Sequence, residues 1–457
     1  MSQASTQDLT PAPVALPERR LDVKHAVALC VGMVVGAGIF KTSPMVAGAL
    51  SSATELYLAW AFGGLLSFLG ALCFAEMAAA FPDAGGDYHF LRRAYGHRLG
   101  FLFAWSRFAV IHTGSMALLA FVFGDYLSQV VDLSPWLGAY AHAVLAAALI
   151  VLLTALNLMG VHIGLGTQLG LMTVVLGSLL LLGLGGASVA LSGQAALTPL
   201  AVKDPSRQDW GTAMVFVFLA YGGWSDAATL SAEMRDAKRG IVRALWWGLS
   251  LVGVVYLLAN WAYLRVLGLD GLAHSSAPAA DLMRACFGRP GEVLMVGLVS
   301  LAALSVMNAI LIAGPRTTYA AARDLASELH LGRWDARRGT PTAAVLATSG
   351  MALALVAFGA YTRGGFATMV DYLSPVYWFF LTLSGLALIV LRQREPEVPR
   401  PYRVPFYPLL PLLFTACSLY VLWSSLVYVK TGALVGVAVL AVGALLLWPL
   451  MRRGQAR

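Results

Sequence analysis

Two apolar segments are each interrupted by a pair of glycines, and their main chain could bind a ligand. They read VGAGIF at residues 35–40, with Pro44 soon after, and AYGGWSD at residues 220–226. Glycine inside a helix costs about 1 kcal/mol relative to alanine, and an unpaired backbone group in lipid costs several kcal/mol more. An unwound stretch at mid-membrane must therefore face protein, water or a ligand.

Unwound segments of this kind would suit the two ends of an α-amino acid. Residues 36–39 would present free N–H groups at the positive end of a half-helix, which favours a carboxylate. Ala220 and its neighbours would leave carbonyl groups free for an ammonium group. The simpler alternative is that the glycines only let two helices approach closely, which is common in membrane proteins. Their matching positions and the polar residues that follow favour the binding site.

The composition places these segments in a membrane protein. The chain has 457 residues, of which 59% are hydrophobic and 12% are charged, and the charged share is roughly half that of soluble domains. This excludes a water-soluble enzyme and a disordered chain. One crossing takes about 20 apolar residues, so we predict an all-α membrane protein with twelve transmembrane helices. Their approximate ranges are 25–49, 56–80, 100–127, 137–157, 163–190, 212–231, 243–267, 291–321, 341–360, 367–391, 408–429 and 432–451.

The basic residues predict the orientation of these spans. Of the 31 Lys and Arg, 22 fall on the side of the two termini and 7 on the opposite side. The positive-inside rule then places both termini in the cytoplasm. Residues 1–24 are predicted to be a disordered cytoplasmic tail, and the lipid bilayer is a partner of the chain. The basic residues form no single patch, so nucleic-acid binding is not expected.

The two interrupted segments also predict internal symmetry. The first span runs outward and the sixth inward, so five spans in residues 25–190 would be related by inversion to five in 212–391. Matching broken helices in two halves are the best sequence indication of a transporter's central site. The two additional helices in 408–451 fall outside the repeat.

Several motifs then resemble one known family. GAGIFKTSP is similar to the first-span motif of the amino acid–polyamine–organocation (APC) superfamily, and YGGWSDAATLSAEMRD to its sixth span, closest to the L-type amino acid transporter branch. PDAGGDY at 82–88, PRPYRVP at 399–405 and GPR at 314–316 agree in the same order. The resemblance implies a five-plus-five inverted-repeat fold with discontinuous helices 1 and 6, and transport by alternating access.

The resemblance also implies which residues hold the substrate. The carboxylate would bind at Gly36, Ala37, Gly38 and Ile39, and the amine at the carbonyl groups near Leu219, Ala220 and Gly222. The aromatic lid of the family falls at Leu219, with Phe218 beside it. Many sodium-independent relatives have a lysine in the fifth span, where this chain has Gly177, so a lysine-based proton mechanism is not supported.

Several polar and aromatic side chains lie near the two glycine-interrupted segments, and for most of them the sequence allows either a role in binding or a purely structural role. Asp226 could face a cationic substrate or take up a proton, or it could simply cap the inner half-helix. Arg107 is expected to extend toward the cytoplasm. His112 in the third span, Ser305 in the eighth, and Tyr221 and Trp224 after the break could contact substrate, or could only pack and hydrogen-bond between helices.

The sequence thus predicts an L-amino acid transporter, most simply an exchanger, in the bacterial inner membrane. The alternative is a transporter of cationic amino acids or polyamines with Asp226 as counter-charge, and with proton coupling. No catalytic residue, cofactor or metal site is predicted, since the spans lack hydrolase, phosphate-binding and metal-ligand motifs. Heteromeric L-type members bond a glycoprotein through a cysteine after the third span. The loop 128–138 has none, so no such subunit is expected.

Overall fold

The computed structural model describes most of the chain as helices. The described residues are 22–36, 38–83, 85–159, 165–192, 209–227, 234, 237–324, 330–335, 340–362, 364–430 and 433–454. Within these ranges the extended structure is limited to isolated bridge positions, at Met234 and between Asp335 and Thr340. The all-α prediction is confirmed for this part of the chain. The predicted tail, except for its last three residues, lies outside the described ranges.

Nine helices or helix series of the described residues are long and apolar enough to cross a membrane. Each coincides with one of the predicted spans to within several residues at most ends. In chain order they are α3 (Ala53–Ala80), α5–η1–α6 (His97–Ser106, Arg107–His112, Thr113–Leu127), α7–η2–α8 (Ser134–Leu137, Gly138–Tyr140, Ala141–Leu158), α9 (Leu165–Leu191), α11 (Ala237–His274), α12 (Pro278–Asp324), α13 (Thr342–Tyr361), α14 (Phe366–Arg394) and α15 (Leu409–Val429).

Three further apolar elements lie where the remaining predicted spans fall. The helices α1 (Val23–Val34) and α2 (Ile39–Ala49) meet at a bend of 49°. The helix α10 (Trp210–Ala220) has only 11 residues, too few to cross a hydrocarbon core alone. The last helix, α16 (Ala433–Gly454), contains a shorter apolar stretch, Leu434–Leu445.

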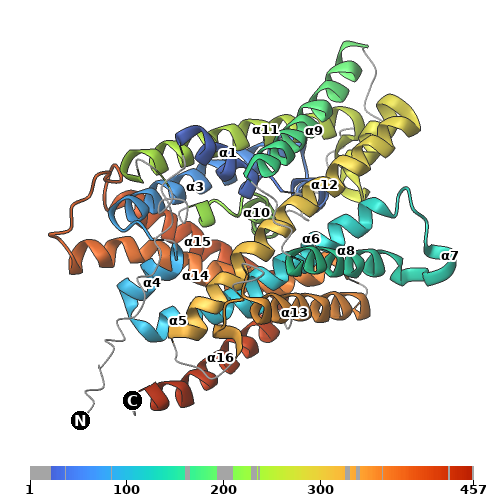
Figure 1. The fold of residues 1–457 in the computed structure, drawn as a ribbon. Helices are drawn as coiled ribbons and strands as arrows, with labels where there is room; N and C mark the ends of the chain where they lie inside the picture. The colour runs from blue at the N-terminus through green and yellow to red at the C-terminus, as the bar shows by residue number, and fades with distance from the viewer. Residues whose placement is uncertain are drawn as a thin grey trace, which may run out of the picture.

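The long helices pack in pairs that repeat between the two halves of the chain. α3 packs along α11, α6 along α12, and α8 along α13. The cross-contacts match as well, since α9 lies against α12 and α14 lies against α6. Figure 1 shows α10 in the middle of this bundle, close to α15, with the short helix α4 (Asp87–Tyr95) toward one end and α7 at the other. The two interrupted helices are thereby held at the centre of the fold.

A buried acid fixes the end of the bundle near α4. Glu76 on α3 is completely buried and accepts hydrogen bonds from Arg392 at 2.8 and 2.6 Å and from the amide of Val404 at 2.7 Å. Arg400 lies 3.5 Å away. A buried carboxylate is tolerated only when it is paired in this way. The contacts attach α3 to α14 and to the segment that follows it.

Candidate functional site

The first helix stops at Val34 and resumes at Ile39. The amide of Gly36 donates to the carbonyl of Val34 at 2.9 Å, and the carbonyl of Gly38 accepts from the amides of Lys41 and Thr42 at 2.9 Å each. The amides of Gly38, Ile39 and Phe40 are the first of the helix α2 and have no preceding turn to accept them. Ala37 lies outside the described residues.

The second interruption follows α10 directly. The amide of Gly222 donates to the carbonyl of Leu219 at 3.2 Å, which tightens the last turn. Gly223 has φ +96°, and a Cβ there would lie 2.3 Å from the carbonyl oxygen of Met33 in α1. This position therefore requires glycine for both its conformation and its space. The chain then turns through Asp226, and Glu233 lies outside the described residues.

The two interruptions lie against each other. A Cβ on Gly38 would be 3.9 Å from the Cα of Ala220. Tyr256 on α11 connects the two helix ends, because its hydroxyl lies 3.0 Å from the carbonyl oxygen of Val34 and 3.0 Å from that of Ala220. The amides at the start of α2 and the carbonyls at the end of α10 thus lie within the same small region.

The aromatic residues around the second break are packed between helices. Tyr221 is fully buried, donates to the carbonyl of Trp60 at 3.1 Å, and lies 5.0 Å from the ring of Tyr256. Phe218 packs against Trp378 at 5.3 Å between ring centroids, while Leu219 is half-buried. The structure therefore shows the packing role of Tyr221 and Phe218, and leaves substrate contact as a prediction.

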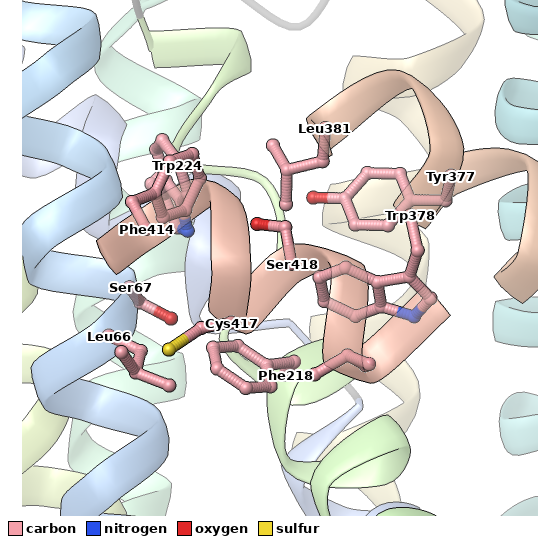
Figure 2. A pocket seen from close by; sticks show the side chains of 11 residues that line it. Leu66, Ser67, Phe218, Trp224, Tyr377, Trp378, Leu381, Phe414, Cys417 and Ser418 are labelled. Atoms are coloured by element: carbon pink, nitrogen blue, oxygen red, sulfur yellow. The ribbon is translucent and has the colours of Figure 1, made fainter. Parts of the chain in front are cut away.

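Phe218 and Trp224 also line a pocket between α3, α10, α14 and α15. Figure 2 shows Trp224 beside Phe414 on one side of the pocket and Trp378 on the other, with Phe218 below them. The hydroxyl group of Ser67 at its wall is buried and has no hydrogen-bond partner among the described residues. The lining is otherwise mostly apolar and aromatic, so the pocket lacks the charged or paired polar groups that would hold a zwitterion.

Arg107 does not extend to the cytoplasm, and that prediction was wrong. Its side chain is 10% exposed and donates to Asp226 at 2.5 Å. Its other close contact is the Nε2 atom of His112 at 2.7 Å. Once a guanidinium is buried, it needs a carboxylate partner, because an uncompensated buried charge costs about 3–5 kcal/mol. Asp226 is therefore already paired with a protein cation.

The eighth-span residues lie beside this region on α12. Val306 Cγ2 would be 3.2 Å from a Cβ on Gly36, so this part of α12 faces the first break, and the neighbouring Ser305 is buried. Asn308 accepts a hydrogen bond from Asn157 of α8 at 3.1 Å, so it joins α12 to α8.

A second buried ion pair lies beyond the first break. Lys41, in the first turn of α2, is 2.6 Å from Asp125 of α6 and donates to the carbonyl of Ser276 at 2.9 Å. Nearby, Tyr126 donates to the carbonyl of Phe40 at 2.8 Å. These contacts attach the start of α2 to α6 and to the segment between α11 and α12. The second half of the broken helix, α2, is therefore held against its neighbours.

Sequence reasoning missed Tyr256, Lys41 and the partner of Arg107. Tyr256 lies in an apolar segment, and no neighbouring residue in the sequence indicates that its hydroxyl group contacts the helix breaks. Lys41 and Asp125 did carry a signal, because each is a charge inside or at the end of an apolar segment, and such charges tend to pair. The sequence alone did not show which acid belongs to which base.

Two interrupted helices with adjoining ends, inside a bundle of apolar helices, are typical of a membrane transporter. The comparisons with known proteins identify the family. The model of the amino acid permease family matches residues 21–447, so the chain belongs to that family and is a multi-pass membrane transporter, not an enzyme.

Three relatives show the range of similar proteins. The chain is 28% identical to the large neutral amino acids transporter small subunit 2 of Oryctolagus cuniculus, over 91% of this chain and 78% of the relative. It is 26% identical to the b(0,+)-type amino acid transporter 1 of Mus musculus, over 90% and 83%. It is 25% identical to the serine/threonine exchanger SteT of Bacillus subtilis, over 90% and 92%. The predicted family is confirmed.

Proposed function

We propose that the chain exchanges L-amino acids across the bacterial inner membrane by alternating access. The observation that carries the proposal is the contact between the two helix breaks, where amides at the start of α2 lie close to the carbonyls at the end of α10. Amides at a helix start favour a carboxylate, and carbonyls at a helix end favour an ammonium group. A free α-amino acid carries both groups on a single carbon atom, so the two sets of main-chain groups must lie close together to bind it.

The proposed site uses the residues expected from the sequence. The carboxylate would bind at the amides of Gly38 and Ile39, together with Ala37 and with Gly36, whose amide would first have to release the carbonyl of Val34 at 2.9 Å. The amine would bind at the carbonyls of Leu219, Ala220 and Gly222. The Ala220 carbonyl already accepts from Tyr256, but a carbonyl oxygen has two lone pairs and can accept a second donor.

The packing of the helices supports a twelve-span, five-plus-five inverted arrangement. Contacts of α3 with α11, α6 with α12 and α8 with α13 pair corresponding spans of two inverted repeats, 25–190 and 212–391. α15 and α16 would then be the additional helices of 408–451. With this topology and the distribution of basic residues, both termini lie in the cytoplasm.

Two observations support exchange by this chain without a disulfide-linked glycoprotein subunit. The serine/threonine exchanger is a bacterial relative, and one of the mammalian relatives is named as a small subunit. The loop from Ser128 to Gly138 contains no cysteine that could form an intersubunit disulfide. We therefore propose that the chain works without a disulfide-linked glycoprotein.

The test is an uptake panel in proteoliposomes preloaded with different amino acids. We expect radiolabelled neutral L-amino acids to enter only when amino acid is present inside, with no requirement for sodium. Uptake into empty vesicles would contradict exchange, and no uptake of any amino acid would contradict the function. Arginine and putrescine belong in the panel as the rival substrates.

The pairing of Asp226 argues against the cationic alternative. Its carboxylate is neutralised by Arg107, so it is not an unoccupied counter-charge for a cationic substrate. If cations were the substrates, Asp226→Asn would abolish their transport selectively. We expect arginine and putrescine to be poor substrates of both forms.

A further inference from the structure

Among the described residues near the second break, one guanidinium group interacts with two carboxylates. Arg107 pairs with Asp226 at 2.5 Å, and Asp87, the first residue of α4, also interacts with both. Asp87 is buried, and its Oδ1 atom has no hydrogen-bond partner among the described residues. Its carboxyl group is also close to the hydroxyl of Ser225, which directly precedes Asp226.

One positive charge cannot neutralise both acids. Burial and the charge of Asp226 raise the pKa of Asp87 to about 7, although Arg107 opposes the shift. Among the described residues, the other titratable groups around the cluster are His112 and Tyr377. The Nε2 of His112 lies 2.7 Å from the guanidinium, which is compatible with a neutral, accepting imidazole and not with a second cation.

The cluster joins parts of the fold that alternating access would separate. Arg107 is the first residue of η1, on the third span, whereas Asp226 belongs to the turn after α10. The Asp226 side chain is 40% exposed and the Arg107 side chain only 10%. The pair therefore lies at the boundary between the buried interior and the accessible surface. If the turn moves away, Arg107 loses Asp226 and is left beside Asp87, whose charged form it then stabilises.

We propose that Asp87 is a proton-binding site, occupied while Arg107 is paired with Asp226 and emptied when that pair separates. The inference rests on the proposed function, since the separation is assigned to the inward-opening step. On opening, the Asp87 O–H bond breaks, the proton passes to cytoplasmic water, and the carboxylate pairs with Arg107. No other bond changes. Protons on that side therefore favour the closed form.

The sign of the pH dependence follows from this linkage. The closed form holds the proton more tightly than the open form, so lowering the pH through about 7 favours closure and slows opening. We expect amino acid exchange at equal pH on both sides to slow several-fold across about two pH units around neutrality. With Asp87→Asn, which cannot ionise, the rate should be independent of pH over the same range.

Two further variants make the test specific. Asp226→Asn leaves Arg107 free for Asp87, so the pH dependence should move to lower pH. Asp83→Asn is the matched control, because Asp83 lies in the segment just before α4 and its side chain is 45% exposed. Asp83 accepts a hydrogen bond from the amide of Gly85, and an asparagine oxygen can do the same. This control should keep the wild-type profile. An unchanged profile in Asp87→Asn would overturn the proposal.

An infrared measurement separates this proposal from the transport function. The carbonyl stretch of a protonated, buried carboxyl group should titrate near neutral pH in the purified wild-type protein and be absent in Asp87→Asn. Absence of the band in the wild type would refute the proton site even if exchange is observed. Its presence would support the site even if no amino acid in the panel were transported.

Discussion

The hydroxyl group of Tyr256 lies 3.0 Å from the carbonyl oxygen of Ala220, the last residue of α10. The same hydroxyl is 3.0 Å from the carbonyl of Val34, the last residue of α1. One side chain of α11 thus contacts the main chain at the ends of both α1 and α10. This geometry ties the position of the proposed amine site to that of the first break.

Replacing Tyr256 with phenylalanine should therefore weaken both stability and substrate binding. The change leaves two buried carbonyl groups without this donor, which costs about 1–3 kcal/mol. We expect a lower melting temperature in detergent and a raised KM for exchange. The matched control is Tyr263→Phe, on the same helix, because the Tyr263 hydroxyl is buried with no hydrogen-bond partner among the described residues. A raised KM in the control as well would refute the role of Tyr256.

Gly38→Ala should reduce substrate affinity without unfolding the protein. The added Cβ would meet the Cα of Ala220 at 3.9 Å, which is an ordinary contact, so the fold can accommodate it. It would however occupy the space between the two breaks, where we place the carboxylate. We expect the dissociation constant, measured by radioligand binding, to rise by about tenfold or more, equivalent to about 1.4 kcal/mol.

Gly48→Ala in the same helix is the control for that variant. A Cβ at Gly48 meets nothing within 4 Å, and alanine favours the helix by about 1 kcal/mol over glycine. Binding should be unchanged and stability equal or higher. Equal affinity of Gly38→Ala and Gly48→Ala would exclude the space between the breaks as the site.

The sequence predicted the elements of this fold better than the contacts between them. The breaks at 35–38 and after Ala220 could be foreseen, because glycine pairs inside apolar runs are a local property. The Tyr256 hydrogen bonds could not, since they join residues that are 222 and 36 positions apart. Which side chain reaches a vacant carbonyl depends on how the helices pack.

Arg107 shows why depth in a span is an incomplete guide. Its position less than three turns from the end of its helix predicted extension to water. In the structure, Arg107 is the first residue of a π-helical turn that ends at His112, and its guanidinium group is buried inside the bundle. The acid that keeps it there is 119 residues away, and no local pattern encodes that distance.

Lys41→Met should destabilise the outer side of the protein. Removing one member of a buried ion pair leaves the other charge uncompensated, at a cost of about 3–5 kcal/mol. Asp125 is 20% exposed, so we expect the lower end of this range. The melting temperature in detergent should fall clearly below that of the wild type.

A double-mutant cycle tests whether the Lys41 effect arises from the pair. Adding Asp125→Leu to Lys41→Met removes the uncompensated carboxylate, and apolar replacement of a buried pair is often neutral. The double variant should therefore recover much of the lost stability. Additive losses from the two substitutions would show that Lys41 and Asp125 act independently.

Glu76→Gln should be the most destabilising of these substitutions, because Glu76 is completely buried and its carboxylate accepts from Arg392 and from the amide of Val404. Neutralising it leaves Arg392 and Arg400 facing each other without an anion, at a cost of about 3–5 kcal/mol. Glu395→Gln is the control, since its pair with Arg93 at 2.7 Å is solvent-exposed and is worth about 1 kcal/mol or less. Thermal melts of the two variants in detergent should differ accordingly, and equal shifts would mean that burial does not set the strength of the Glu76 contacts.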